Sequence, residues 1–331
     1  MAVISYSIWV TERCNMDCKY CYEGYKGNKV MSLETMHYVV EYISEQIRKN
    51  EVEKCNIHFH GGEQLLNYKI IDCFIEELGK IKEAEFVYTI TSNGTILDEK
   101  ILECLKKIQD VNISVDGDED SHNKLRIMRD GTNSYKKIRN NISVMLKNGV
   151  DVCARMTCTK ENLNKVYNNC KTLVDMGIGR IINSIEFWKS LWTKEELEQY
   201  AEQIMKVKEY IIEKTVKCEI DDITATIYSI KGSCRGGISE SVIDCEGNIF
   251  PCMAVYGRTD WKIGNTTTGI MEDWEKRLQS INKTQREECE MCEYKKYCAV
   301  PRCVFYTLYP DTSNLCKNIC TVQNVFMNEF N

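Results

Sequence analysis

The sequence lacks the features that mark several large classes of protein. No apolar run reaches the roughly 18 residues that are needed to cross a bilayer. Residues 1–6 contain no basic segment followed by an apolar one, so no secretion signal is present. Lys and Arg (43) are outnumbered by Asp and Glu (49), and this excess disfavours a nucleic-acid-binding protein with a broad basic face. We therefore expect a cytoplasmic protein that binds neither membranes nor nucleic acids.

Proline is scarce as well, and its placement divides the chain. All three prolines among the 331 residues lie beyond residue 250. Helix and strand periodicity weakens near residue 230, where the density of cysteine rises. We predict a regular unit at 1–215 and a small, loop-rich, cysteine-rich unit with a bridging segment at 216–331. Within the second unit, a hairpin around Glu246-Gly247 and a helix at 268–280 are expected.

The first unit alternates between strand-like and helix-like segments. The predicted strands are 3–10, 55–60, 85–91, 111–115, 150–157 and 180–185. The predicted helices are 33–49, 70–81, 98–108, 134–147, 162–176 and 194–214. Such alternation is typical of parallel strands joined by helical crossovers. Because six repeats fall short of eight, the sequence predicts an α/β fold with a partial (β/α)6 TIM-type barrel, open on one side.

Cysteine is abundant, with 19 residues. A cytoplasmic protein keeps its thiols reduced, so ligation of metal or clusters is a better interpretation than disulfides. Three cysteines fall within 14–21 and nine within 234–331. The others are interpreted as small buried apolar residues: Cys55, Cys73, Cys104, Cys153, Cys158, Cys170 and Cys218.

Cys14, Cys18 and Cys21 form a C-x3-C-x2-C loop directly after the first strand. Three thiolates can hold three corners of a four-iron cluster and leave one iron without a protein ligand. A zinc ion would need a fourth nearby ligand, which the loop does not supply. His58 and His60 alternate on the second strand, and we interpret them as barrel-interior residues rather than ligands.

This loop resembles the signature of the radical S-adenosylmethionine (SAM) superfamily, in which an aromatic residue, here Tyr20, precedes the third cysteine. Other segments resemble motifs of that family, in the expected order after successive strands. They are Gly61-Gly62-Glu63, Thr91-Ser92-Asn93-Gly94, Ser114-Val115-Asp116-Gly117, His122-Asn123-Lys124-Leu125-Arg126 and Arg155-Met156-Thr157.

The resemblance implies a [4Fe-4S] cluster at the three loop cysteines and a SAM site beside it. Glu63 would contact the methionyl amino group, and Ser114 and Arg155 would face the ribose and the carboxylate. The full set of implied SAM contacts is Tyr20, Gly61, Gly62, Glu63, Ser92, Asn93, Ser114, Asp116 and Arg155. The implied chemistry is reductive cleavage of SAM to a 5′-deoxyadenosyl radical, which abstracts a hydrogen atom.

The later cysteines resemble the SPASM extension of radical SAM enzymes that modify peptides, in which seven cysteines hold two auxiliary clusters. The spacing is C-x12-G-x4-C over 234–252, C-x2-C-x5-C-x4-C over 289–303, and C-x3-C over 316–320. The first auxiliary cluster would use Cys234, Cys252 and Cys303, with Cys245 as a candidate fourth ligand. The second would use Cys289, Cys292, Cys298 and Cys316, with Cys320 as the alternative to Cys316.

A structural zinc ribbon would explain Cys289 and Cys292 but not the G-x4-C element. Three [4Fe-4S] clusters are therefore expected.

The resemblance implies that the substrate is a ribosomally made precursor peptide. An open iron in the first auxiliary cluster would favour a substrate thiolate, and hence a thioether crosslink of the sactipeptide or ranthipeptide type. Carbon–carbon crosslinking, epimerisation and sulfatase-type formylglycine formation are the alternatives. Met253-Ala254 follows Cys252, where sulfatase maturases often have an acidic residue, and this counts against formylglycine formation. A non-enzymatic iron–sulfur electron carrier is the alternative outside enzymes, and it would need a fourth cysteine in the first loop.

The partners follow from the same resemblance. The cysteine loop begins at residue 14, so we expect no leader-binding domain before the barrel. Either a separate protein presents the leader peptide, or the barrel and the cluster unit bind the peptide directly. A flavodoxin- or ferredoxin-type reductant is expected to supply the electron.

Overall fold

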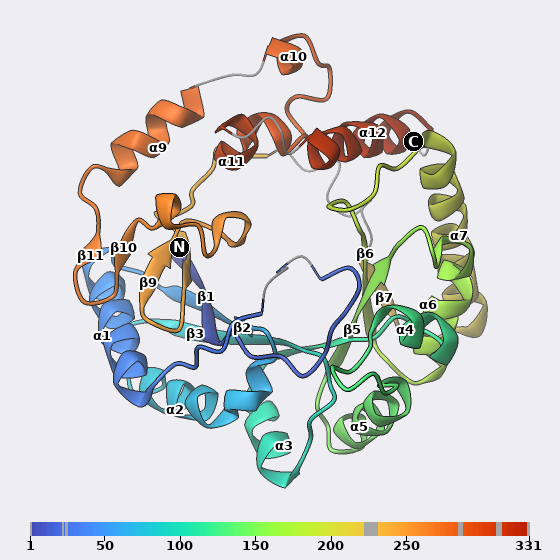
Figure 1. Ribbon diagram of the computed structural model, residues 1–331, viewed down its shortest axis with the longest axis horizontal. Helices are drawn as coiled ribbons and strands as arrows, with labels where there is room; N and C mark the ends of the chain where they lie inside the picture. Colours follow the sequence, from blue (N-terminus) through green and yellow to red (C-terminus); the bar gives the residue numbers. More distant parts are fainter. Residues whose placement is uncertain are drawn as a thin grey trace.

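A computed structural model describes residues 2–21, 23, 26–221, 231–283, 287–308 and 313–329. Figure 1 shows a curved sheet with helices around its outside. Within this part of the chain the sheet has 11 strands, in the order β11-β10-β9-β8-β1-β2-β3-β4-β5-β6-β7. The sheet does not close, because β7 and β11 are its two edges.

The barrel strands run in chain order, and each is parallel to the next. They are β1 (Val3–Thr11), β2 (Lys54–Gly61), β3 (Glu85–Ser92), β4 (Asp110–Ser114), β5 (Val152–Cys158), β6 (Arg180–Ile185) and β7 (Glu219–Asp221). The predicted partial barrel is confirmed, and β7 extends it by one short strand.

The helices between these strands agree with the periodicity of the sequence. They are α1 (Leu33–Lys49), α2 (Tyr68–Leu78), α3 (Glu99–Leu105), α4 (Glu119–Leu125), α5 (Tyr135–Lys147), α6 (Val166–Asp175) and α7 (Lys194–Lys214). Ser32 caps α1, as predicted, by accepting a hydrogen bond from the Thr35 amide. The short α4 was not predicted. Short 3-10 helices occur at η1 (Gln64–Asn67), η2 (Leu163–Lys165), η3 (Met253–Val255), η4 (Thr259–Trp261) and η5 (Val300–Arg302).

The C-terminal part continues the same sheet. The predicted hairpin is present as β8 (Glu240–Ile243) and β9 (Asn248–Phe250), and β8 runs parallel to β1. The predicted helix at 268–280 is wrong at its start, because β11 (Gly269–Ile270) pairs there with β10 (Gly264–Asn265). The helices of this part are α9 (Trp274–Lys283), α10 (Glu287–Glu290), α11 (Val304–Leu308) and α12 (Ser313–Glu329). The division of the chain at residue 215 stays a prediction.

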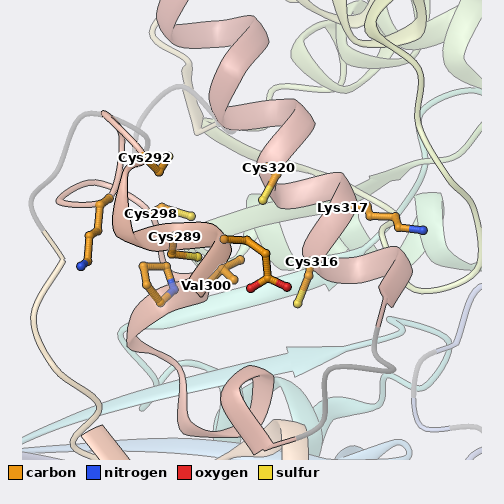
Figure 2. A pocket seen from close by; sticks show the side chains of 10 residues that line it. Cys289, Cys292, Cys298, Val300, Cys316, Lys317 and Cys320 are labelled. Carbon is orange, nitrogen blue, oxygen red and sulfur yellow. The ribbon is translucent and has the colours of Figure 1, made fainter. Parts of the chain in front are cut away.

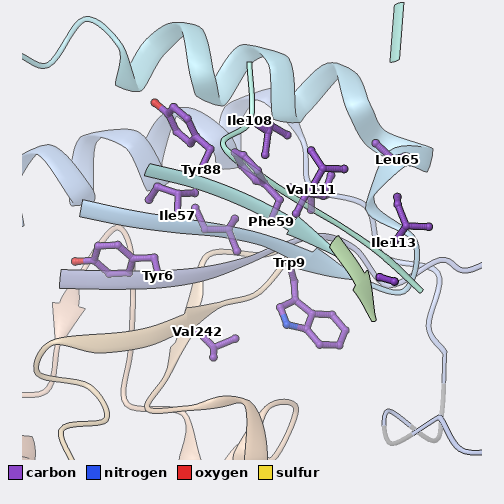
Figure 3. Packing of buried hydrophobic residues seen from close by; sticks show 14 of the residues in the cluster. Tyr6, Trp9, Ile57, Phe59, Leu65, Tyr88, Ile108, Val111, Ile113 and Val242 are labelled. Carbon is purple, nitrogen blue, oxygen red and sulfur yellow. The ribbon is translucent and has the colours of Figure 1, made fainter. Parts of the chain in front are cut away.

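The main core lies between the sheet and the helices. Figure 3 shows Ile57, Phe59, Tyr88 and Val111 on the helix side of the sheet, and Trp9 on the opposite side. Five of the seven scattered cysteines are buried, as predicted: Cys55, Cys104, Cys153, Cys158 and Cys170. The interior side of the barrel carries Trp9 together with polar side chains such as His58 and His60. None of the helices in the described ranges is both long enough and apolar enough to traverse a membrane.

Candidate active site

The first cysteine loop is held in place by the segment that follows α4. The Asp17 amide donates to the Ile127 carbonyl (2.7 Å), and the Lys19 amide donates to the Leu125 carbonyl (2.9 Å). In the opposite direction, the Arg129 amide of the same segment donates to the Asn15 carbonyl of the loop (3.0 Å). These backbone hydrogen bonds fix the loop at the carboxyl end of β1, where α/β barrels place their active sites.

Gly61 and Gly62 allow the end of β2 to contact this loop. A Cβ atom on Gly61 would lie 2.2 Å from the Thr11 carbonyl oxygen, and one on Gly62 would lie 2.5 Å from the Arg13 carbonyl oxygen. Gly61 also has φ +141°, which favours glycine. The Glu63 amide then donates to the Arg13 carbonyl (2.7 Å). Only glycine at both positions permits this close approach of the two backbones.

Glu63 joins the ends of β2 and β3. Its side chain is 1% exposed, and its carboxylate accepts from the Leu65 amide (3.1 Å), the Ser92 hydroxyl (2.8 Å) and the Asn93 amide (2.7 Å). Burial raises the pKa of Glu63, and these hydrogen bonds oppose the rise. The Asn93 side chain donates to the Asn15 side chain (2.8 Å) in the cysteine loop. The structure thus brings Glu63, Ser92 and Asn93 together beside the cysteines.

Asp116 belongs to a buried polar group. It has no exposed surface, it pairs with the Arg126 guanidinium (3.0 Å), and it accepts hydrogen bonds from the Tyr20 hydroxyl and the Thr157 amide. Arg126 also lies over the Tyr20 ring, 5.0 Å from its centroid. Asp116 thus fixes Tyr20 of the cysteine loop. The contacts of Asp116 and of the Tyr20 ring with SAM stay predictions.

Ser114 and Arg155 are register partners on β4 and β5. Both side chains are half-buried on the interior side of the barrel. Among the residues described, the Arg155 guanidinium makes no hydrogen bond or ion pair. Burial lowers the pKa of His58 to about 4 and that of His60 to about 3, with a contribution from the Arg155 charge. These histidines are neutral interior residues, as interpreted from the sequence, and His58 Nε2 lies 3.1 Å from the Thr91 hydroxyl oxygen.

Lys26 is a site residue that the sequence did not indicate. Its Nζ donates to the Met16 carbonyl (2.7 Å). Burial lowers the pKa of Lys26, but the charges of Cys14, Cys21 and Cys18 more than offset this effect and raise it. The ammonium group therefore lies beside all three loop cysteines. Only its position in space reveals this, because no spacing rule relates it to the cysteine motif.

The donor set of the loop fits a cluster rather than a single metal ion. Cys14 is buried, and Cys18 and Cys21 are partly buried. In the ranges that the structure describes, no three His, Cys, Asp or Glu side chains are close enough to share one metal ion. A four-iron cluster is a larger body, whose thiolate ligands lie farther apart than those of zinc. Three thiols around one loop therefore match three corners of such a cluster.

The first auxiliary group is the set of later cysteines that the sequence predicts to hold a cluster: Cys234, Cys252 and Cys303. Burial and the charge of Cys234 raise the pKa of Cys252, and burial with the charges of Cys252 and Cys234 raises that of Cys303 to about 11. Cys245 is placed elsewhere, because its Sγ donates to the Trp9 carbonyl (3.2 Å) at the edge of the barrel. Its candidate role as the fourth ligand of this group stays a prediction, which this hydrogen bond does not favour.

The second auxiliary group surrounds a cavity of about 330 Å³ (Figure 2). Five cysteines line this cavity: Cys289, Cys292, Cys298, Cys316 and Cys320. Cys316 and Cys320 come from α12, one helical turn apart. The sequence left open whether Cys316 or Cys320 is the last ligand of this group. In the structure both cysteines line the cavity.

A larger cavity of about 1000 Å³ lies between the first cysteine loop and the C-terminal hairpin. Trp9 and Tyr256 stack in its wall with ring centroids 3.6 Å apart. Met253 and Ala254, which follow Cys252, also line it. Glu23 also lines this cavity. Burial raises the pKa of Glu23 to about 7. The charge of Lys26 opposes this rise, and the charge of Glu63 adds to it. The cavity therefore has Met253 and Ala254, next to Cys252, in one part of its wall and Glu23, which is influenced by Glu63, in another.

Comparison with known families and proteins agrees with this geometry. Residues 8–182 match the Radical SAM superfamily.

An uncharacterized protein of Methanocaldococcus jannaschii is 29% identical over 174 residues, which are 52% of this chain and 59% of that protein. The radical SAM cyclopropyl synthase TigE of Paramaledivibacter caminithermalis is 26% identical over 48% of this chain and 36% of its own length. The chain thus spans about half the length of these relatives. A cysteine-type anaerobic sulfatase-maturating enzyme of Clostridium novyi is 24% identical over 77% of this chain and 74% of its own.

Two solved structures share the whole fold. Native anSMEcpe with bound AdoMet superposes with a TM-score of 0.80 at 17% identity, covering 98% of this chain and 96% of that one. Streptococcus suis SuiB bound to the precursor peptide SuiA has a TM-score of 0.73 at 16% identity, covering 96% and 76%. The fold similarity therefore includes the C-terminal, cysteine-rich part of this chain.

Proposed function

Because this chain belongs to the radical SAM superfamily, we propose that it modifies a ribosomally made precursor peptide by abstracting a hydrogen atom from it. As a member of this superfamily, it is an enzyme that binds SAM and a [4Fe-4S] cluster. The observation that carries the proposal is the cavity of about 1000 Å³, which is lined by Glu12 and Glu23 on either side of the first cysteine loop and by Met253 and Ala254 directly after Cys252. This volume is at the upper end of the range of about 300–1,000 Å³ that is typical of ligand pockets, so it is large enough for a short peptide segment.

The residues of the chain prepare both cofactors. Cys14, Cys18 and Cys21 would hold the cluster, and Arg155 with Ser114 would bind the carboxylate and ribose of SAM. When bound, the cluster and SAM supply a one-electron cleavage that yields the 5′-deoxyadenosyl radical. The buried pair of Asp116 and Arg126 keeps the cysteine loop rigid, so that the reacting atoms stay in line.

The first auxiliary group supports a thioether product. Cys234, Cys252 and Cys303 offer three ligands for a four-iron cluster, and Cys245 does not join them. The remaining corner suits a thiolate of the substrate. In the net reaction, the substrate would lose one hydrogen atom to the deoxyadenosyl group, and its thiol would lose a proton and one electron as the carbon–sulfur bond forms. A cluster held by Cys234, Cys252 and Cys303 would supply the acceptor for that electron. The product is two hydrogens lighter than the substrate.

Two alternatives are less well supported by the cavity. Sulfatase-type oxidation is favoured by the fold similarity to anSMEcpe, but Met253 and Ala254 line the cavity where an acidic residue would be expected after Cys252. Epimerisation needs a thiol that donates a hydrogen atom. Cys158 is fully buried in the core on the helix side of β5, so it cannot serve as that donor.

The test is anaerobic co-expression with each short cysteine-containing peptide that the open reading frames next to the gene encode. The expected result is a peptide two mass units lighter, together with 5′-deoxyadenosine formation by the reconstituted enzyme and SAM. Replacing the substrate cysteine by serine should abolish the mass loss. The same mass loss on a cysteine-free peptide would contradict thioether formation, and no change in any peptide would contradict peptide modification.

A further inference from the structure

The second auxiliary group contains one cysteine more than a four-iron cluster can use. Five cysteines line its cavity of about 330 Å³, whereas a [4Fe-4S] cluster takes four cysteine ligands. Figure 2 shows all five around the same space, with Cys320 on the helix above Cys316. The fifth thiol therefore needs an explanation.

Burial divides the five cysteines into two classes. Cys289 is 9% exposed, and Cys298 and Cys316 are 6% exposed each. These three pack with Val300 into one buried cluster of their own. Cys292 and Cys320, in contrast, are exposed. Three positions around the cavity are thus enclosed by protein, and two cysteines remain at its exposed side.

Helix α12 cannot easily exchange Cys316 for Cys320 by sliding. Asn318 lies between them in the sequence and is fully buried on another face of the helix. Its side chain accepts a hydrogen bond from the Trp192 amide (2.8 Å) and donates to the Ser190 carbonyl (2.7 Å). The helix is thereby fixed on the β6–α7 loop with Cys316 buried in the group. The choice of ligand thus lies between the two exposed cysteines, Cys292 and Cys320.

We propose that Cys292 and Cys320 are alternative ligands to the same corner of the second auxiliary cluster, and that Cys289, Cys298 and Cys316 are its fixed ligands. This rests on the proposed function of the chain as a radical SAM peptide-modifying enzyme, and on the prediction from the sequence that it holds a second auxiliary [4Fe-4S] cluster here. The exchange is a thiolate substitution: one iron–sulfur bond forms and one breaks, the incoming thiol loses a proton and the outgoing thiolate gains one. No electron is transferred. The charges of the four other cysteines act on Cys320, which agrees with its place in the group.

The exchange has a consequence for the cluster. Its exposed corner keeps a cysteine ligand even when one of the two thiols is lost to oxidation. At any moment one thiol of the pair is bound to iron, and the other is exposed to solvent.

Iron content tests the two ligands separately. In a protein whose Cys14, Cys18 and Cys21 are replaced by alanine, only the auxiliary clusters remain, with about eight irons per chain. Cys292→Ala and Cys320→Ala should each keep all of this iron, and the double variant should lose about four irons or show an altered cluster spectrum. Cys316→Ala, at the buried position on the same helix, should lose about four alone. Loss of about four irons in either exposed single variant would overturn the proposal.

Pulse alkylation of the intact holoenzyme provides a test that does not depend on the folding of variants. Iodoacetamide is applied briefly under anaerobic conditions, and the labelled positions are mapped by mass spectrometry. We expect label on Cys292 in some chains and on Cys320 in others, but never on both in one chain that retains the cluster. Label confined to one of the two would show a fixed ligand and overturn the exchange.

The same measurements separate this inference from the proposed function. If the triple variant holds no more than about four irons and both exposed thiols are alkylated together, no second auxiliary cluster exists, and that part of the proposed function fails. If the iron is present but one single variant loses it, only the exchange fails. Cys73→Ala, at a partly buried cysteine on α2 outside every group, is the matched control and should change neither iron nor labelling.

Discussion

Ser114 and Arg155 lie opposite each other in the parallel register between β4 and β5, and both side chains face the interior of the barrel. Neighbouring strands are about 4.8 Å apart, so the hydroxyl and the guanidinium can reach one small molecule together. Within the described part of the chain no acidic group neutralises Arg155. A ligand carboxylate can therefore be its partner.

The first prediction concerns this guanidinium. Arg155→Ala should weaken SAM binding by about 1.5–3 kcal/mol, because it removes a charge-assisted hydrogen bond. This corresponds to an increase of roughly 10- to 150-fold in the dissociation constant, measured by equilibrium dialysis with radiolabelled SAM. Arg139→Ala, at an exposed arginine on α5, is the control. Unchanged affinity in Arg155→Ala would remove this residue from the SAM site.

The second prediction concerns the contact between β2 and the cysteine loop. Gly62→Ala places a Cβ atom 2.5 Å from the Arg13 carbonyl oxygen, so the loop must move. We expect the reconstituted variant to lose about four irons and the ability to cleave SAM. Gly179→Ala is a matched control, because nothing lies within 4 Å of the added atom. Full iron content in Gly62→Ala would show that the loop tolerates displacement.

The third prediction concerns pH and the fully buried His122. Its Nδ1 accepts from the Asp116 amide (3.3 Å), its Nε2 lies 2.9 Å from the Ser134 hydroxyl oxygen, and burial lowers its pKa to about 4. The unfolded chain binds a proton near pH 6.5, so the contribution to stability is complete above pH 6.5 and is lost as the pH falls towards 4. Between pH 7.5 and 5.5 the loss amounts to about 1.4 kcal/mol.

The variant His122→Gln isolates this effect. Its free energy of unfolding, measured anaerobically in urea, should fall less than that of the wild type between these two pH values. His37→Gln, at an exposed histidine on α1, serves as the control. An identical pH dependence of wild type and His122→Gln would show that folding does not lower the pKa of His122.

The fourth prediction concerns the attachment of α12. Asn318→Ala leaves the Trp192 amide and two backbone carbonyls of the β6–α7 loop, those of Phe187 and Ser190, without their partner. We expect a loss of about 1–3 kcal/mol in unfolding free energy, with reduced iron at the second auxiliary group. Asn324→Ala removes only a hydrogen bond to the Cys320 carbonyl within the exposed side of the same helix. Equal stability of the two variants would contradict the role of Asn318.

Much of the fold could be predicted because it depends on local periodicity. The bounds of β6 and α7 agree with the sequence prediction at both ends, since apolar spacing and the Thr193 capping box define them locally. Helix α12 was not predicted, because polar Asn318 and Gln323 are buried on it and interrupt the apolar pattern. The start of α9 was misplaced for a different reason. Gly269 has φ +79°, which an α-helix does not allow, and residues 269–270 pair as strand β11 with β10. Helix α9 therefore begins only at Trp274.

Only the site residues that belong to recognisable sequence motifs could be predicted. The cysteine loop, Glu63 and Ser92 lie close together because they are at the carboxyl ends of the neighbouring parallel strands β1, β2 and β3. The role of Asp116 could not be predicted, because its partner Arg126 reaches it only through the fold of α4. Likewise, the separation of Cys245 from Cys234 and Cys252 depends on the pairing of β8 with β1, which no spacing rule contains.

The last prediction tests that separation. Cys245 donates to the Trp9 carbonyl at the barrel edge, whereas Cys252 lies with Cys234 and Cys303. Cys245→Ala should therefore keep all of the iron, about 12 atoms for three clusters, while Cys252→Ala should lose about four. The first auxiliary cluster would then have an iron that no cysteine closes. Added cysteine-containing peptide should shift its electron paramagnetic resonance signal, and the serine analogue should not. Loss of iron in Cys245→Ala would instead place this thiol on the cluster, and thiolate capture would then require it to leave before a substrate cysteine could bind.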